Sequence, residues 1–329
     1  MRTQLKVFGV LLAAALWGAA PALVNAEPAD SATEPQKKLG PPPDKQTAAK
    51  VNAYIDVMNN ENEQLFSQQR EWLSVIDPKV GPTCKEQISI RQEIGPKDGR
   101  YDVYRKRLKA KPALPADAAA LRMVDAVEEL HDLGRGPGPY NSYQGKDGSW
   151  CKRLKEVFPQ VLAIFQKYSA SEAEVRAHVE RFTDERDERD AQAALKKYGR
   201  NYRYAFARMV LDGKIMMRGL HAEMAKHSPD PNVVRDLFTA YLTLGEEMKA
   251  KMDVDVHAKV ELFPHVFRFF LIESLPKIKR GRDALLESLS APPEKRRAER
   301  NERAFSQVIS AYNEIIGYMN QVKFDPNMK

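Results

Sequence analysis

The stretch KVNAYIDVMNNENEQ, residues 50–64, decides the fold class, because its apolar side chains recur with the period of an α-helix. When successive residues are placed about 100° apart around a helix axis, residues that recur every three or four positions fall on one stripe. This stripe contains Val51, Ile55, Met58, Asn62, Leu65, Gln69, Leu73 and Ile76. The pattern runs from about residue 46 to Ile76, and Asp77-Pro78 then ends it, since proline disfavours a helical residue before it. We therefore predict that the folded part begins with one long amphipathic helix.

Amide side chains interrupt the apolar stripe at regular intervals. Asn62 and Gln69 lie within it, seven residues apart, and Asn52 and Asn59 flank it with the same spacing. A polar position inside a coiled-coil-like seam fixes helix register at some cost in stability. A ligand site is the alternative interpretation. We predict a packing role, with amide hydrogen bonds between helices.

The end of the sequence repeats this arrangement. A stripe is formed there by Phe305, Ile309, Tyr312, Ile316 and Met319. Asn313 and Asn320 flank this stripe on one side. The first and last helices therefore present similar faces, and we predict that they are adjacent.

The rest of the chain also shows helical periodicity. We expect helices near 116–133, 232–250, 255–275, 278–290 and 295–323. Pro159 predicts a kink or a first turn, and Ser171 and Glu174, with capping-box spacing, predict the start of a long helix that Gly199 and Gly213 divide. In this helix, TDERDERDAQ allows the i,i+4 pairs Glu185–Arg189 and Arg186–Asp190 of an exposed face. The predicted fold is all-α: an elongated bundle of long antiparallel helices in a single domain, residues 46–323.

The N-terminal residues predict export. Arg2 and Lys6 precede an apolar run, and Val24-Asn25-Ala26 is typical of a cleavage site, so residues 1–26 read as a signal peptide. A membrane anchor is the alternative, but Gly18, Pro21 and Asn25 interrupt the run early. Residues 27–45 are proline-rich and predict a flexible linker, and residues 324–329 form a tail. We expect a periplasmic or secreted protein with no lipidation cysteine and no transmembrane segment after cleavage.

The chain has two cysteines, Cys84 and Cys151. An even number of cysteines in an exported protein favours a disulfide over reactive thiols, and a C-x-x-C redox motif is absent from the sequence. We predict a structural bridge between them.

One segment is strongly basic. PKDGRYDVYRKRLKAK, residues 96–111, carries seven basic residues, with Tyr101, Tyr104 and Leu108 at helical spacing. The chain as a whole has a formal charge of only +7, spread among many charges of both signs, which argues against a nucleic-acid partner. In an exported protein this segment predicts contact with an anionic envelope polymer or lipid, or else a solvated helix face.

One helix face could bind a metal. Met217, His221 and Met224 share the spacing i, i+4 and i+7, and thioether with imidazole suits copper. The alternative is an ordinary core stripe, since methionine commonly fills helix interfaces and no fourth ligand is visible. We predict no cofactor.

Three segments together resemble a known family. VNAYIDVMNN near residue 51, RFFLIESLPKIKRG at 268–281 and VISAYNEIIGYMN at 308–320 are similar to the YiiG-like family of bacterial envelope proteins. The resemblance implies an all-helical domain outside the cytoplasm and supplies no catalytic residues. Many relatives look like lipoproteins, and this chain lacks the lipidation cysteine.

These features favour an exported, non-enzymatic helical protein that binds another macromolecule, either an envelope protein or an anionic envelope polymer. Binding of a small ligand or copper is the second hypothesis. A hydrolase is the third, since folding can bring together catalytic groups that are distant in sequence.

Overall fold

The computed structural model describes residues 39–85, 99–135, 149–257, 270–292 and 298–319, and every regular element in these ranges is helical. The elements are α1 (Lys45–Val75), α2 (Arg100–Leu108), α3 (Asp117–Arg135), α4 (Ser149–Tyr198), α5 (Tyr202–Met224), α6 (Pro231–His257), the π-helical turn η1 (Phe270–Ser274), α8 (Leu275–Ser290) and α9 (Ala298–Met319). The predicted all-α fold is confirmed. The predicted signal peptide, most of the linker and the tail lie outside the described residues.

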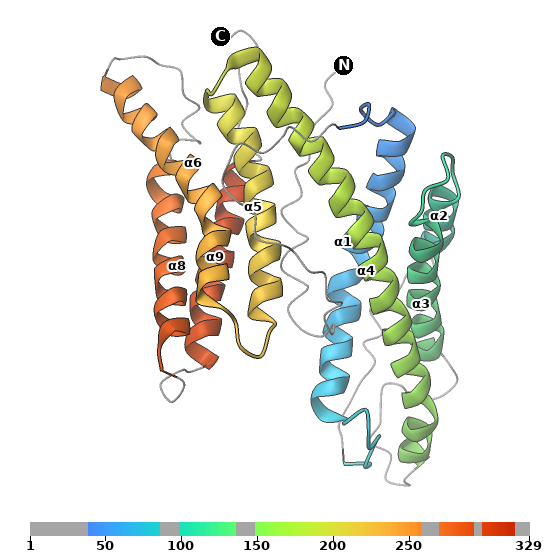
Figure 1. Ribbon diagram of the computed structural model, residues 1–329. Coiled ribbons are helices and arrows are strands. Elements are labelled where there is room, and N and C mark those ends of the chain that lie inside the picture. The colour runs from blue at the N-terminus through green and yellow to red at the C-terminus, as the bar shows by residue number, and fades with distance from the viewer. Residues whose placement is uncertain (1–38, 86–98, 136–148, 258–269, 293–297, 320–329) are drawn as a thin grey trace. The chain divides into compact units, whose positions relative to one another are not determined.

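The described chain divides into two compact units (Figure 1). The N-terminal unit ends at Thr183 and contains α1, α2, α3 and the first part of α4. The C-terminal unit begins at Asp184. Because α1 and α9 belong to different units, each described by itself, the predicted adjacency of these helices stays a prediction. The elongated shape and the single domain stay predictions as well.

In the N-terminal unit, α1 packs against both α2 and α3. Its core contains large side chains that are almost fully buried, among them Tyr54, Trp72, Phe165 and Tyr168. Asp44 caps α1 by accepting a hydrogen bond from the Thr47 backbone N–H at 2.7 Å. The disulfide between Cys84 and Cys151 is present, as predicted, and it ties the segment after α1 to the first turn of α4.

The C-terminal unit contains a four-helix arrangement in which each helix packs against two others. α5 contacts α6 and α9, and α8 contacts α6 and α9 (Figure 1). Four antiparallel helices joined in this way enclose one apolar core. Its buried residues include Met209, Phe238, Leu285, Val308 and Ile315.

Several predicted boundaries are wrong. α4 runs without a break from Ser149 to Tyr198, with Pro159 inside it, so Ser171 does not begin a helix. Instead, the Ser171 hydroxyl accepts a hydrogen bond from Arg122 Nε of α3 at 3.3 Å, and Glu174 binds the same guanidinium at 2.5 Å. The spacing of three residues that resembled a capping box serves a contact between helices.

The two predicted dividing glycines behave differently. Gly199 has a φ of 67° and follows the end of α4, as its backbone freedom predicts. Gly213 lies inside α5, which continues through it. α6 likewise continues to His257, past the predicted end near residue 250.

Within the part of the chain that the structure describes, no helix combines the length and the apolar character needed to cross a bilayer.

Candidate functional site

A buried lysine fixes the chain that follows the basic helix α2. Lys50 on α1 is 4% exposed, and its ammonium donates to the carbonyl oxygens of Ala110 and Pro112 at 2.5 and 2.7 Å. It also pairs with Asp117 at 2.7 Å. Burial raises the pKa of Asp117, but hydrogen bonds from Lys50 and Tyr54 outweigh burial, so the net pKa is lowered. Asp117 therefore remains a carboxylate at neutral pH and holds Lys50 in place.

The arginines of α2 point toward acidic residues of the neighbouring helices. Arg105 pairs with Asp125, at 2.7 Å, and with Glu128, both on α3. Arg107 pairs with Asp56 of α1 at 2.6 Å. A third arginine, Arg100, lies 3.4 Å from Glu61 of α1. Together with the buried side chains of Tyr101, Tyr104 and Leu108, these pairs fasten the helix to the unit.

The lysines of residues 100–111 face solvent. Lys106, Lys109 and Lys111 are exposed and form no ion pair with any residue that the structure describes. Val103, one helical turn before Lys106, is 55% exposed. The helix α2 and the residues directly after it therefore present three positive charges that lack an ion-pair partner among the described residues, beside an apolar side chain. We call this set, Val103, Lys106, Lys109 and Lys111, the α2 basic face.

Among the described residues of the N-terminal unit, Glu61 is the most deeply buried acid, at 1% exposure. Its Oε1 accepts a hydrogen bond from the Tyr104 hydroxyl at 3.3 Å, while its Oε2 has no hydrogen-bond partner among the described residues. Burial raises the pKa of Glu61, and the opposing effects of the Arg100 charge and the Tyr104 hydrogen bond are smaller.

This raised pKa predicts a pH dependence of stability. The native state holds the Glu61 proton more tightly than the unfolded state, so stability falls as pH rises from the ordinary pKa of 4.5 through the higher pKa of the folded state. Glu61→Gln lacks this titration. We expect urea midpoints to show wild type losing stability relative to Glu61→Gln between pH 4 and pH 7. A difference that does not change with pH would contradict the assignment.

Asn62, from the predicted seam, bridges α1 and α4. It is 4% exposed, its Oδ1 accepts from the Tyr168 hydroxyl at 2.6 Å, and its Nδ2 donates to Glu172 at 3.1 Å. Gln69 accepts a longer hydrogen bond, 3.4 Å, from Ser169. Amide side chains of α1 thus form hydrogen bonds with polar side chains of α4 at two positions that are seven residues apart on α1.

The other residues of the predicted seam are more peripheral. Asn52 is exposed, Asn59 and Asn313 are partly buried, and Asn320 lies outside the described residues. The Asn59 Oδ1 atom is buried without a hydrogen bond to a described residue. Of the predicted seam residues that the structure describes, Asn62 is therefore the most deeply buried.

Asn62→Leu should be destabilising. The substitution leaves the buried Tyr168 hydroxyl without its acceptor, and we expect a loss of about 1–3 kcal/mol in the free energy of unfolding. Asn52→Leu on the same helix is the control, and it should change stability by less than about 0.5 kcal/mol because Asn52 is exposed. Equal effects in chemical denaturation would refute a special role for Asn62.

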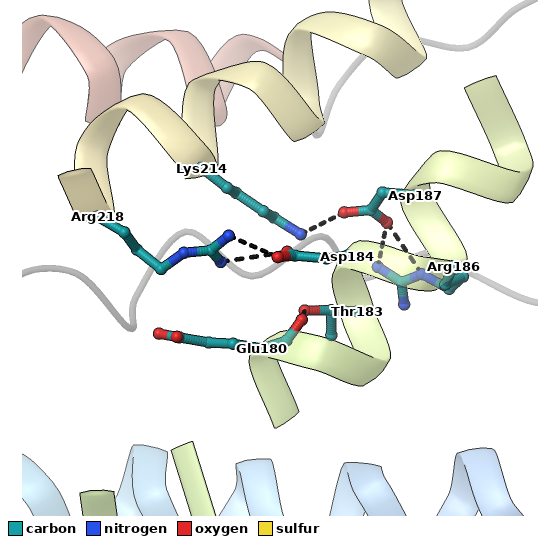
Figure 2. A network of polar contacts seen from close by, with 7 residues as sticks. All are labelled: Glu180, Thr183, Asp184, Arg186, Asp187, Lys214 and Arg218. Atoms are coloured by element: carbon teal, nitrogen blue, oxygen red, sulfur yellow. Dashed lines mark hydrogen bonds and ion pairs between the residues drawn. The ribbon is translucent and has the colours of Figure 1, made fainter. Parts of the chain in front are cut away.

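A second charged cluster joins α4 and α5 in the C-terminal unit (Figure 2). Arg218 binds both oxygens of Asp184, at 2.5 and 3.1 Å, and Lys214 pairs with Asp187. Arg186 pairs with its neighbour Asp187 at 2.8 Å instead of the predicted Asp190. The predicted pair of Glu185 with Arg189 is present at 3.2 Å. The segment predicted to be an exposed face is thus a contact between helices.

The predicted copper ligands remain together on α5, although their surroundings are those of a core. Met217 is fully buried, and Met224 is partly buried. The His221 ring packs edge-on against Phe305 of α9, with the ring centroids 4.9 Å apart. Copper binding stays a prediction, and the packing of His221 favours the core interpretation.

Sequence reasoning missed the charged residues that link the helices of the N-terminal unit, namely Lys50, Glu61, Arg100 and Asp117. Charged and amide side chains ordinarily predict a solvated face. The only signal was their position on helix faces that also carry buried apolar residues.

The sequence model of a family described as "Protein of unknown function (DUF3829)" matches residues 45–314. No curated protein and no solved structure matches the chain. The match covers both units, while the narrower YiiG-like assignment stays a prediction.

Proposed function

Because the chain belongs to this family of proteins of unknown function, DUF3829, we propose its role from its own residues: a non-enzymatic envelope protein, exported by its signal peptide, that binds an anionic envelope polymer or an anionic lipid surface. The α2 basic face is the proposed contact. An envelope protein as partner is the competing proposal.

The separation of arginines from lysines on one short segment supports this proposal most strongly. All three arginines of α2 lie against acidic side chains, and Lys50 holds the carbonyl groups of residues 110 and 112. The three lysines are therefore displayed on a fixed backbone, which reduces the conformational entropy lost on binding. Cationic side chains near an anionic surface each contribute about 1 kcal/mol.

The disulfide and the predicted signal peptide are both compatible with an extracytoplasmic location. There, anionic polymers and lipid head groups are the abundant partners for a basic face of this size.

Neutralising the α2 basic face should weaken binding to anionic vesicles. For Lys106→Gln/Lys109→Gln/Lys111→Gln, we expect about 100-fold weaker binding to phosphatidylglycerol vesicles in a sedimentation assay, since three contacts of about 1 kcal/mol are lost. Binding of wild type should also fall steeply with salt.

The matched control is Lys152→Gln/Lys155→Gln/Lys196→Gln, which removes the same charge from exposed positions of α4. Equal weakening by both triple variants would show that only net charge matters and would refute the α2 basic face. If wild type bound no anionic vesicle but crosslinked reproducibly to one envelope protein, the competing proposal would replace this one.

A further inference from the structure

The disulfide of the N-terminal unit is accessible to solvent. Cys84 and Cys151 are both partly exposed, and no residue from 77 to 85 is buried. Val80, for example, is 73% exposed. A segment that buries no side chain gains little from packing, so its attachment to the start of α4 depends strongly on the bridge.

The backbone of Cys84 favours opening of the bond. Its φ is 71°, in the left-handed region, and Cys84 is the one residue other than glycine with a positive φ in the described part of the chain. The Cβ atom makes this conformation costly. Gly81, three residues earlier, has a φ of 78° without that cost. An open bond allows Cys84 to return to an ordinary conformation, and this relief favours the reduced form.

The surroundings of Cys151 favour a thiolate. Cys151 lies in the first turn of α4, where the helix dipole stabilises negative charge. Lys152, Arg153 and Lys155 follow it, are exposed and form no ion pair with any residue that the structure describes. Lys155 is four positions from Cys151 and therefore its neighbour on the helix surface, whereas the acidic Glu156 is five positions away and faces elsewhere. A helix N-terminus and adjacent cations both lower the pKa of a thiol.

These surroundings make the two sulfur atoms unequal in thiol–disulfide exchange. The thiol with the lower pKa leaves faster, so the thiolate of a dithiol reductant attacks Sγ of Cys84, the S–S bond breaks, and Cys151 leaves as a thiolate. The second thiol of the reductant loses its proton and attacks the mixed disulfide, and Cys84 leaves and takes up a proton. The reductant is thereby oxidised to a disulfide, and its electron pair passes to the protein.

We propose that the Cys84–Cys151 disulfide is a redox switch, which an external dithiol opens and in which Cys151 is the leaving thiolate. When the switch opens, residues 77–85 are released from the first turn of α4. The switch uses none of the lysines of the α2 basic face, so it does not depend on the proposed binding of an anionic partner.

Reduction of the full chain without denaturant tests the switch. In a buffer of reduced and oxidised glutathione we expect the bond to be largely open, whereas structural disulfides of secreted proteins stay closed. Brief trypsin digestion, followed by mass spectrometry, should then show faster cleavage after the exposed Lys79 than in the oxidised protein. A bond that stays closed, or cleavage at Lys79 that reduction does not change, would overturn the proposal.

The variant Cys84→Ser tests the role of Cys151. We expect its alkylation by iodoacetamide to accelerate with pH through a midpoint below about 7.5, whereas an ordinary thiol has a pKa of about 8.5. A midpoint of about 8.5 or higher would refute the leaving-group assignment. Circular dichroism shows whether the variant folds; if it does not, the same rates are measured on reduced wild type, with the two cysteines distinguished by mass spectrometry.

Lysine substitutions in the Cys84→Ser background test the cause. Lys152→Gln/Lys155→Gln should raise the midpoint of alkylation, because two cations near the thiolate are lost. The matched control is Lys196→Gln/Lys197→Gln, which removes the same charge from the last turn of α4 and should leave the midpoint unchanged. Equal shifts from both double variants would show that net charge alone acts on Cys151, which contradicts the assigned surroundings.

Discussion

Lys50→Met and Asp117→Asn should each lower the free energy of unfolding by about 3–5 kcal/mol, because Asp117→Asn leaves the buried Lys50 ammonium without its charged partner and Lys50→Met leaves the partly buried Asp117 carboxylate without one. The Lys50 side chain is 2% exposed, so its ammonium cannot recover hydration when Asp117 becomes neutral. In Lys50→Met, the carbonyls of Ala110 and Pro112 lose their donor as well. Urea denaturation at pH 7 measures both losses.

The double variant Lys50→Met/Asp117→Asn tests the cause. It should be more stable than the sum of the single losses predicts, by about 1–3 kcal/mol, because neither charge then remains without its partner. Arg107→Gln, which breaks the exposed pair with Asp56, is the control and should cost less than about 1 kcal/mol. Strict additivity at the Lys50–Asp117 pair would mean that the two residues stabilise the unit independently.

The sequence was sufficient to predict where helices form. The stripe of residues 51–76 predicted α1 almost to its ends, because an apolar period of about 3.6 residues that persists over so long a segment is typical of a helix alone. Helix-capping signals were less reliable, because one of them lies in the interior of α4. Ser171 and Glu174 have the spacing of a capping box, but the same spacing also places two side chains on one helix face, where Arg122 binds them.

The buried charges could not be predicted in the same way. Lys50 and Asp117 are 67 positions apart, and nothing local to either residue indicates the other. Glu61 lies within NNENEQ, which has the composition of a solvated face, although Arg100 and Tyr104 of α2 contact it in the folded unit. Such pairs depend on tertiary structure, so a helical pattern in one sequence does not reveal them.

Gly213→Ala should lower the free energy of unfolding by about 1–3 kcal/mol, although alanine is the better helix former. A Cβ at this position would lie 2.6 Å from Cε2 of Tyr312 and 3.1 Å from Cε2 of Tyr241. Both tyrosines are almost fully buried, so neither ring can move aside without disturbing the packing of α5 with α6 and α9.

Gly317→Ala on α9 is the matched control, since a Cβ there meets nothing within 4 Å. It should stabilise the protein by about 0.5–1 kcal/mol, so the two glycine substitutions differ in sign. Thermal unfolding followed by circular dichroism distinguishes them.

A third variant separates packing from helix propensity at Gly213. Tyr312→Leu removes the ring atoms that the new methyl group would contact, so Gly213→Ala should cost much less in that background than in wild type. If Gly213→Ala stabilised the protein as Gly317→Ala does, the close approach of the two tyrosine rings to α5 would be wrong. The glycine would then serve only to weaken the helix, as its sequence position first indicated.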